Sequence, residues 1–282
     1  IMGVLIFTIL PLIYNISMAF TNYSKVNDHL VLFDWVGLAN FKKILNFGDS
    51  IGKQFYSVLG WTLIWAIVAT ALNYILGMIL AIIINRKETK GKAFWRFCFV
   101  LSIAVPQFVS LLIMRTMLQP TGIVNTLLLK YGLIDTALPF FSNATWARVT
   151  VIVINLWVGI PYTLLQVTGI LQNIPGELYE AAKIDGANGW KTFWKITVPL
   201  LKPTIIMTFI MSINGTLQLF DESMNLTKGG PANSTITMSH YVYNTCFVNV
   251  PNFGYAAAMS FIIFIMVAVL AFINLKVGDT RD

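Results

Sequence analysis

Charged residues are scarce in this sequence, and their scarcity excludes an ordinary water-soluble domain. Asp, Glu, Lys and Arg make up 11% of the 282 residues, whereas 57% are hydrophobic. An average soluble domain is about 25% charged, and a soluble fold of this length cannot bury so much apolar surface. We therefore predict that lipid forms part of the solvent around this chain.

Cysteine and histidine are equally sparse. Cys98 and Cys246 lie far apart, without the spacing of a zinc site or a disulfide framework, and His29 and His240 have no partner pattern. The sequence contains no HExxH motif, nucleophile elbow or paired catalytic motif. The string GANGWKT ends like a phosphate-binding loop, but Trp190 stands where that motif needs glycine. We expect no metal, catalytic or ATP site, and hence no enzyme activity, on this chain.

Six long apolar stretches are present instead. A helix needs about 20 apolar residues to cross a bilayer core of about 30 Å. An ionised side chain at the centre of such a helix costs about 2.5–3.5 kcal/mol on insertion scales, so charged residues set the boundaries. The predicted spans are 1–20, 54–85, 97–119, 147–172, 203–222 and 255–275. We predict an all-α polytopic membrane protein in which residues 1–282 form a single transmembrane domain.

The first span does not have the features of a cleaved signal peptide. Its apolar run is too long, lacks a basic start and is not followed by a cleavage site of small residues. Because Ile1 already lies inside this run, we expect the natural chain to begin upstream.

Lysine and arginine predict the orientation in the membrane. The net charge is +7, and the segment 86–96 alone holds five Lys or Arg residues, while 177–202 holds four. The positive-inside rule places these loops and both chain ends in the cytoplasm, which explains the basic residues without a nucleic-acid partner. Arg115 and Arg148 are expected as anchors at the outer edge.

Helix breakers interrupt several of these spans. Pro106 breaks the third, Gly159 and Pro161 interrupt the fourth, and Gly215 lies within the fifth. Broken helices persist in membranes where they line a cavity or pack against protein. Glycine and proline are also common in membrane helices as simple packing kinks, so both interpretations stay open.

The long cytoplasmic segment 173–202 has the composition of a folded loop. Pro175 suits a helix start, a helix is expected over about 177–185, and Gly186 supplies its C-terminal stop. A second amphipathic stretch follows. Mixed charge argues against a lipid-lying helix for the first stretch, but not for the second.

This segment resembles the cytoplasmic signature of binding-protein-dependent ABC importer permeases, which is E-A-A, three residues, then G, followed by I-x-x-P-L. The matching residues are Glu180, Ala181, Ala182, Gly186, Ile196, Pro199 and Leu200. The strings WVGLANFKKIL and LTKGGP are similar to segments of the carbohydrate branch, most of all maltose-type permeases. The resemblance covers nearly the whole chain.

The resemblance implies a type I ABC importer permease fold and a transport mechanism. A second, homologous permease subunit would complete the pathway as a heterodimer, and two cytoplasmic ATPase subunits would hold ATP and Mg. An extracellular or periplasmic binding protein would deliver the sugar. The chain itself would bind no cofactor and would lie, multi-pass, in a bacterial cytoplasmic (inner or plasma) membrane.

The short cytoplasmic helix is implied to sit in a groove of an ATPase subunit and to transmit its closure. The implied coupling residues are Glu180, Ala181, Ala182, Asp185 and Gly186. Small side chains such as alanine allow close approach of a partner surface. Asp185 could cap the next helix or bind the partner, and the sequence does not separate these roles.

The resemblance also implies a sugar site, because the string NLWVGIPY is similar to a site string of maltose-type permeases. The implied substrate-binding residues are Asn155, Gly159 and Tyr162 in this string and, from alignment on the GGP of LTKGGP, a second set of Ser212, Gly215, Thr216 and Leu219. Each set shares one helix face by its spacing. Interhelical hydrogen bonding is the alternative role for such polar residues, and Asn214 and Gln218 are nearby polar alternatives. At Gly215 and Leu219 the sequence departs from polar or aromatic positions of the maltose protein.

Two acidic residues, Asp221 and Glu222, end the fifth predicted span. They could form a gate near a docked binding protein, but a solvated helix end is the favoured interpretation. The spans otherwise lack the intramembrane carboxylates that a gradient-driven transporter or a membrane-embedded enzyme usually needs. A neutral oligosaccharide is favoured as the cargo over glycerol phosphate or another polyol derivative, because the pathway offers few cations.

Overall fold

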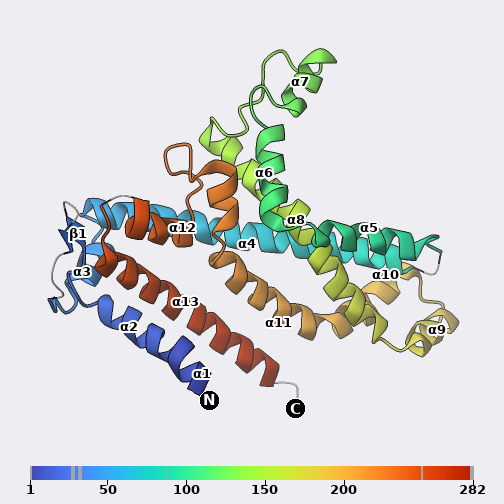
Figure 1. Cartoon of the computed structure of the whole chain (residues 1–282). Helices are drawn as coiled ribbons and strands as arrows, with labels where there is room; N and C mark the ends of the chain where they lie inside the picture. Colours follow the sequence, from blue (N-terminus) through green and yellow to red (C-terminus); the bar gives the residue numbers. More distant parts are fainter. Residues whose placement is uncertain (1, 27–28, 31–33, 87, 249, 280–282) are drawn as a thin grey trace.

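The computed structural model describes residues 2–26, 29–30, 34–86, 88–248 and 250–279 and is built almost entirely of helices (Figure 1). The predicted all-α fold is therefore confirmed, apart from a two-residue antiparallel pair of strands, β1 (Lys25–Val26) and β2 (His29–Leu30). Ile1, Lys87 and Arg281, which entered the sequence predictions, lie outside the described residues.

The first predicted span is a rod of three consecutive helical pieces. These are α1 (Met2–Val4), the π-helical η1 (Leu5–Ile9) and α2 (Leu10–Met18). Together they form an apolar helix that is shorter than the other spans. The strand pair and α3 (Ala39–Leu45) then connect it to α4.

Four helices are long and apolar enough to cross a bilayer. They are α4 (Ser50–Asn85), α8 (Ala144–Gln172), the continuous helix Gly189–Leu217 and the stretch Phe253–Lys276 of α13 (Phe253–Asp279). The helix Gly189–Leu217 joins α10 (Gly189–Thr192), η2 (Phe193–Thr197) and α11 (Val198–Leu217). It begins before the predicted boundary at 203, because the helix runs through both Pro199 and Pro203, and it ends at Leu217, before the predicted boundary at 222.

The third predicted span is not one straight helix. It consists of α5 (Lys92–Ala104) and α6 (Gln107–Met117), which meet at 90°. Val105, before Pro106, adopts an extended conformation, as expected for a residue whose helical backbone a following proline disfavours. The predicted break at Pro106 is confirmed, whereas the single span over 97–119 is replaced by a bent pair.

The fourth span differs from its prediction in the opposite sense. α8 continues through Gly159 and Pro161, although both were expected to interrupt it. The reason for Gly159 lies in packing, because a Cβ there would lie 2.6 Å from the side-chain amide of Asn73 on α4. Gly77 on α4 similarly leaves room for Thr163 on α8. The small residues therefore allow close approach of α4 and α8, which pack along each other more extensively than any other described helix pair.

The buried apolar side chains form three clusters along the long axis of the molecule. One joins α3, α4 and α13 with α12 (Met238–Tyr243), and includes Phe55 and Met238. A second surrounds Trp65 and Leu111 and reaches Leu226 in η3 (Ser223–Thr227). A third joins the last turns of α4 to α8 and includes Leu164. Between the second and third clusters, α4 and α8 bury several polar side chains, namely Thr70, Asn73, Asn155 and Thr163.

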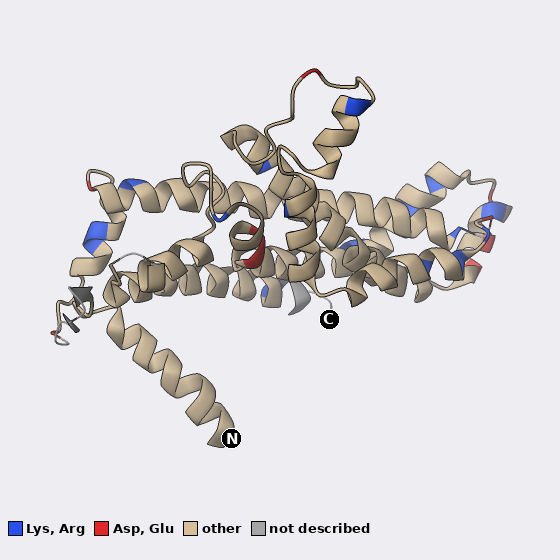
Figure 2. Ribbon diagram, turned by 45° about the horizontal axis from the view of Figure 1, so that its top comes forward, with Lys and Arg blue, Asp and Glu red and all other residues tan. Residues whose placement is uncertain are grey.

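Lys and Arg gather at the end of the molecule where α4 ends and where α5 and α9 (Gly176–Ile184) begin (Figure 2). A smaller basic group lies at the opposite end, on and beside α3 (Figure 2). The predicted basic loops 86–96 and 177–202 are therefore neighbours in space. The helix α7 (Ile123–Lys130) extends away from the helical body beyond α6, and η4 (Asn244–Val248) links α12 to α13 (Figure 1).

Candidate functional site

A cavity of about 310 Å³, to which many polar side chains contribute, lies between the second and third apolar clusters. It is lined by α4, α6, α8, α11 and the segment after α11. Its lining residues are Thr70, Asn73, Tyr74, Gln107, Asn155, Val158, Gly159, Tyr162, Thr163, Gln166, Ser212, Gly215, Thr216, Leu219 and Glu222. All seven residues that the sequence predicts to bind substrate are among them, so the structure brings the two predicted helix faces together.

The α11 residues face α4 across the cavity. The Ser212 and Tyr74 hydroxyls lie 3.0 Å apart, and the Thr216 and Thr70 hydroxyls lie 3.3 Å apart. Tyr74 also donates to Gln166 Oε1 on α8 at 3.1 Å. These polar residues therefore line the cavity, and they also make the interhelical hydrogen bonds that were considered from the sequence as their alternative role.

Gly215 leaves open space on this wall, because no atom outside its own helical turn lies within 4 Å of a Cβ built there. Leu219 packs against the second apolar cluster. The polar alternatives Asn214 and Gln218 do not line the cavity, and Gln218 Nε2 donates to the Asn214 carbonyl within its own helix.

The α8 residues differ among themselves in burial and bonding. Asn155 is 6% exposed and makes hydrogen bonds in two directions. Its Oδ1 accepts a bond of 2.8 Å from Asn73 Nδ2, and its Nδ2 donates to both carboxylate oxygens of Glu222, at 2.8 and 3.0 Å. Tyr162 is 51% exposed and makes no side-chain hydrogen bond to the described residues. Tyr162 is therefore the member of this trio whose hydroxyl and ring are available to a ligand.

Glu222 is a lining residue that sequence reasoning missed. Its side chain is 1% exposed, so the favoured prediction of a solvated helix end is wrong for Glu222, whereas Asp221 is exposed. Gln107 Nε2 also donates to Glu222 Oε1, at 3.3 Å. Gln107 is the first residue of α6, directly after the bend at Pro106, and reaches the carboxylate from there.

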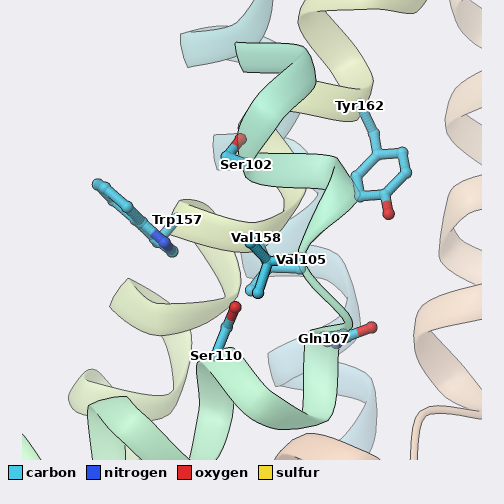
Figure 3. Close-up of a pocket in the computed structure, with 7 residues that line it drawn as sticks. All are labelled: Ser102, Val105, Gln107, Ser110, Trp157, Val158 and Tyr162. Carbon is cyan, nitrogen blue, oxygen red and sulfur yellow. The ribbon is translucent and has the colours of Figure 1, made fainter. Parts of the chain in front are cut away.

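A smaller pocket adjoins the cavity at the bend between α5 and α6 (Figure 3). It shares Gln107, Val158 and Tyr162 with the cavity. Figure 3 shows the side chains of Gln107 and Tyr162 on one side of the bend and that of Trp157 on the other. The bend thus places Gln107 of α6 at the edge of the cavity, on the same side as Tyr162 of α8.

The predicted cytoplasmic helix is present as α9, with Pro175 at its start. Gly186 has a φ of +70° and ends the helix, and the Ala187 N–H bonds to the Ala182 carbonyl across this turn. Ala182 is buried, whereas Ala181 is exposed. The cap of the following helix is Asn188, whose Oδ1 accepts from the Lys191 N–H at 2.9 Å, so Asp185 does not have the capping role considered from the sequence.

An exposed apolar surface surrounds this turn. Ile184 is 86% exposed and Trp190 is 71% exposed. The Tyr179 hydroxyl lies 3.1 Å from that of Thr197, which ties α9 to the base of the long helix Gly189–Leu217. The helix α9 is therefore bonded to the same long helix that lines the cavity farther along its length.

Residues 73–278 match the family described as the inner membrane component of binding-protein-dependent transport systems. The chain belongs to this family. It is accordingly a multi-pass membrane protein, and the family match includes α8, α9, α11 and most of the cavity. The predicted family resemblance is confirmed.

Relatives of known function are similar over most of this family member. The chain is 37% identical to the maltodextrin transport system permease protein MalC of Streptococcus pneumoniae, over 97% of the chain and 67% of MalC. It is 37% identical to the lactose transport system permease protein LacF of Rhizobium radiobacter, over 80% of the chain and 77% of LacF. It is 34% identical to the maltose/maltodextrin permease MalF of Klebsiella aerogenes, of which it spans about half (48%).

Solved structures confirm the fold of this family member. A bacterial ABC transporter that imports the acidic polysaccharide alginate matches over the whole chain and 93% of its own chain, with a TM-score of 0.83 and 22% identity. The fold is thus that of an ABC importer permease.

Arg148, Arg115 and His240 of this family member bond to neighbouring segments. Arg148 Nε donates to the Ser234 carbonyl at 2.9 Å and stacks over Trp61, and Arg115 donates to the Asn225 carbonyl. His240 Nδ1 lies 2.7 Å from Ser223 Oγ, and burial lowers the pKa of this imidazole. Among the described residues, no group of His, Cys, Asp and Glu could hold a metal ion.

Proposed function

We propose that this chain is a transmembrane subunit of an ATP-driven, binding-protein-dependent importer of a neutral oligosaccharide. The cavity carries the proposal: hydroxyl and amide groups alternate with the rings of Tyr74 and Tyr162 on its walls. Sugars are held by hydrogen bonds to their hydroxyls and by contact with their apolar ring faces. The maltodextrin and lactose permeases among the relatives support the same class of cargo.

The cavity also favours a neutral sugar over glycerol phosphate. Within the described part of the chain, no Lys or Arg lines it, and Arg115 and Arg148 are bonded elsewhere. A phosphate group would need such cations, since Arg and Lys are its usual partners. The buried Glu222 removes one sequence argument against a gradient-driven transporter, but membership of a binding-protein-dependent family argues for ATP-driven transport.

The proposed coupling element is α9. We assign this role to Glu180, Ala181, Ala182, Asp185 and Gly186. The exposed apolar surface at Ile184 and Trp190 supports a docked partner, because water-exposed apolar patches commonly mark protein interfaces. In this proposal ATP and Mg lie on two separate ATPase subunits, and a second, homologous permease completes the pathway.

The orientation follows from the same proposal. The basic end of the molecule, with α9, lies in the cytoplasm together with the C-terminus, and the binding protein docks at the opposite end. The helix α9 lies at one end of the long helices, and α3 and β1 lie at the opposite end (Figure 1), which supports this arrangement.

Purification of the tagged chain from its native membrane in mild detergent tests the assembly. We expect a second permease and an ATPase to copurify, and the complex with its binding protein to hydrolyse ATP faster when maltotriose or lactose is added. A chain that purifies alone, without ATPase activity in its fraction, would contradict the proposal.

A further inference from the structure

Glu222 is a buried carboxylate without a cationic partner. Within the described residues, its three hydrogen bonds all come from neutral amides, two from Asn155 and one from Gln107. Buried charges in proteins are normally paired with an opposite charge or a metal ion. The carboxylate of Glu222 is thus solvated by the protein but not neutralised by it.

Burial disfavours the ionised form of this carboxyl group, whereas the direction of its hydrogen bonds favours that form. Asn73 donates to Asn155, and Asn155 in turn donates to Glu222, so the donors of both amides point along one chain toward the carboxylate. Hydrogen bonds to the charged form of a group stabilise that form. Asn155 accepts a hydrogen bond through its Oδ1 and donates through its Nδ2, so Asn155 is a positioning residue for Glu222.

The charge faces the cavity, because Glu222 is one of its lining residues. No Lys, Arg or His among the described residues shares that lining. A cleft lined by one sign of charge and bounded by apolar walls focuses the field and selects solutes by charge. Above and below this polar layer the walls are apolar clusters, which include Trp65 on one side and Leu164 on the other.

We propose that Glu222 is the charge filter of this cavity, admitting neutral sugars and excluding solutes that carry a carboxylate or phosphate group. This inference rests on the proposed function, since it specifies which sugars pass. It also differs from a purely structural role for the amide chain. A structural role predicts that substitutions at Glu222 affect all solutes equally, whereas a charge filter changes the ratio between neutral and anionic solutes.

A cysteine in the cavity wall measures the charge directly and needs no sugar. In the complete importer with Cys98→Ser and Cys246→Ser, Gly215→Cys places a thiol where the wall is open. The rates of its reaction with a cationic and an anionic methanethiosulfonate of similar size are compared. We expect the cationic reagent to react faster, and Glu222→Gln to lower the cation-to-anion rate ratio about fivefold or more.

Two variants serve as matched controls. Glu222→Asp keeps the charge and should keep most of the ratio. Asp221→Asn removes the neighbouring exposed charge and should change the ratio by less than about twofold, because water screens that charge. An unchanged ratio in Glu222→Gln, or an equal change in Asp221→Asn, overturns the proposal. If the Glu222→Gln importer does not assemble, the Gly215→Cys importer with Glu222 intact still tests the proposal. A cation-to-anion rate ratio near one in that importer also overturns the proposal.

A matched pair of sugars tests the consequence for selectivity. Binding of maltotriose and of its aldonic acid, which carries a carboxylate at the oxidised reducing end, is measured on the complex in nanodiscs. We expect the acid to bind about tenfold more weakly, and Glu222→Gln to narrow that difference. Equal binding of both sugars refutes the filter and leaves the sugar function intact. Binding of neither refutes the sugar function, and the thiol rate ratio then decides for or against the filter.

Discussion

At the scale of single residues, the cavity combines side chains that sequence reasoning finds with one that it does not. Asn155, Tyr162 and Ser212 could be predicted because each lies in a local string or on one helix face. Glu222 could not, because its burial depends on partners from α6 and α8 that are remote in sequence. A charged residue at a helix end is usually solvated, and only the tertiary contacts overturn that expectation here.

Tyr162 offers the most direct test of the site. Tyr162→Ala should reduce sugar uptake by reconstituted importer roughly tenfold, because an aromatic contact worth about 1.4 kcal/mol is lost. Tyr162→Phe keeps the ring and should retain most uptake if the ring face is the contact. Radiolabelled sugar uptake into proteoliposomes measures both variants. Wild-type uptake by Tyr162→Ala would remove this residue from the site.

Alanine substitutions at two glycines of the cavity wall are expected to change the stability of the protein in opposite directions. In Gly159→Ala the new Cβ would lie 2.6 Å from the Asn73 amide, which must shift and lose its bond to Asn155. Overpacking of this kind costs about 1–3 kcal/mol, so the melting temperature in detergent should fall. Gly215→Ala meets open space and should be neutral or stabilising, since alanine favours helix. Equal melting temperatures for the two variants would contradict this account of α4–α8 packing.

At the scale of elements, whether a proline or glycine interrupts a helix depends on how the neighbouring helices pack against that position. Pro106 produces a 90° bend, whereas Pro161 is accommodated inside a continuous α8. The sequence alone treats both as breaks, because it contains no information on whether neighbouring helices support the chain. The sequence predicts α9 closely, since its start at Pro175 and its stop at Gly186 are local signals.

A substitution that strains the turn after α9 is expected to weaken the coupling between sugar binding and ATP hydrolysis. Gly186 has a φ of +70°, a conformation that β-branched residues strongly disfavour, while asparagine tolerates it. Gly186→Val should therefore displace the end of α9 and reduce sugar-stimulated ATP hydrolysis several-fold, with Gly186→Asn much closer to wild type. The assay is phosphate release by the purified complex, with retention of the ATPase checked by gel. Equal activity of the two variants would argue against α9 as the coupling element.

At the scale of the whole molecule, the distribution of charge predicts how the chain sits in the membrane. The basic residues near α5 and α9 lie at one end of the long helices, whereas α7 projects upward from near their middle, beyond α6 (Figures 1 and 2). The positive-inside rule places the first group in the cytoplasm. Lys191 on α10 and Lys130 on α7 are both exposed lysines on short helices, so they form a matched pair of reporters for the two sides.

In a background of Cys98→Ser and Cys246→Ser, a membrane-impermeant maleimide applied to intact cells should label Lys130→Cys. It should reach Lys191→Cys only after the membrane is permeabilised, because that residue lies beside α9 on the proposed cytoplasmic side. A cysteine appended to the C-terminus should behave like Lys191→Cys. The reverse pattern would invert the chain and detach α9 from any cytoplasmic ATPase. A third outcome is that Lys191→Cys is protected in intact cells while the C-terminal cysteine is labelled. That result would require an odd number of spans between Lys191 and the C-terminus, and it would refute the predicted arrangement of the last two spans.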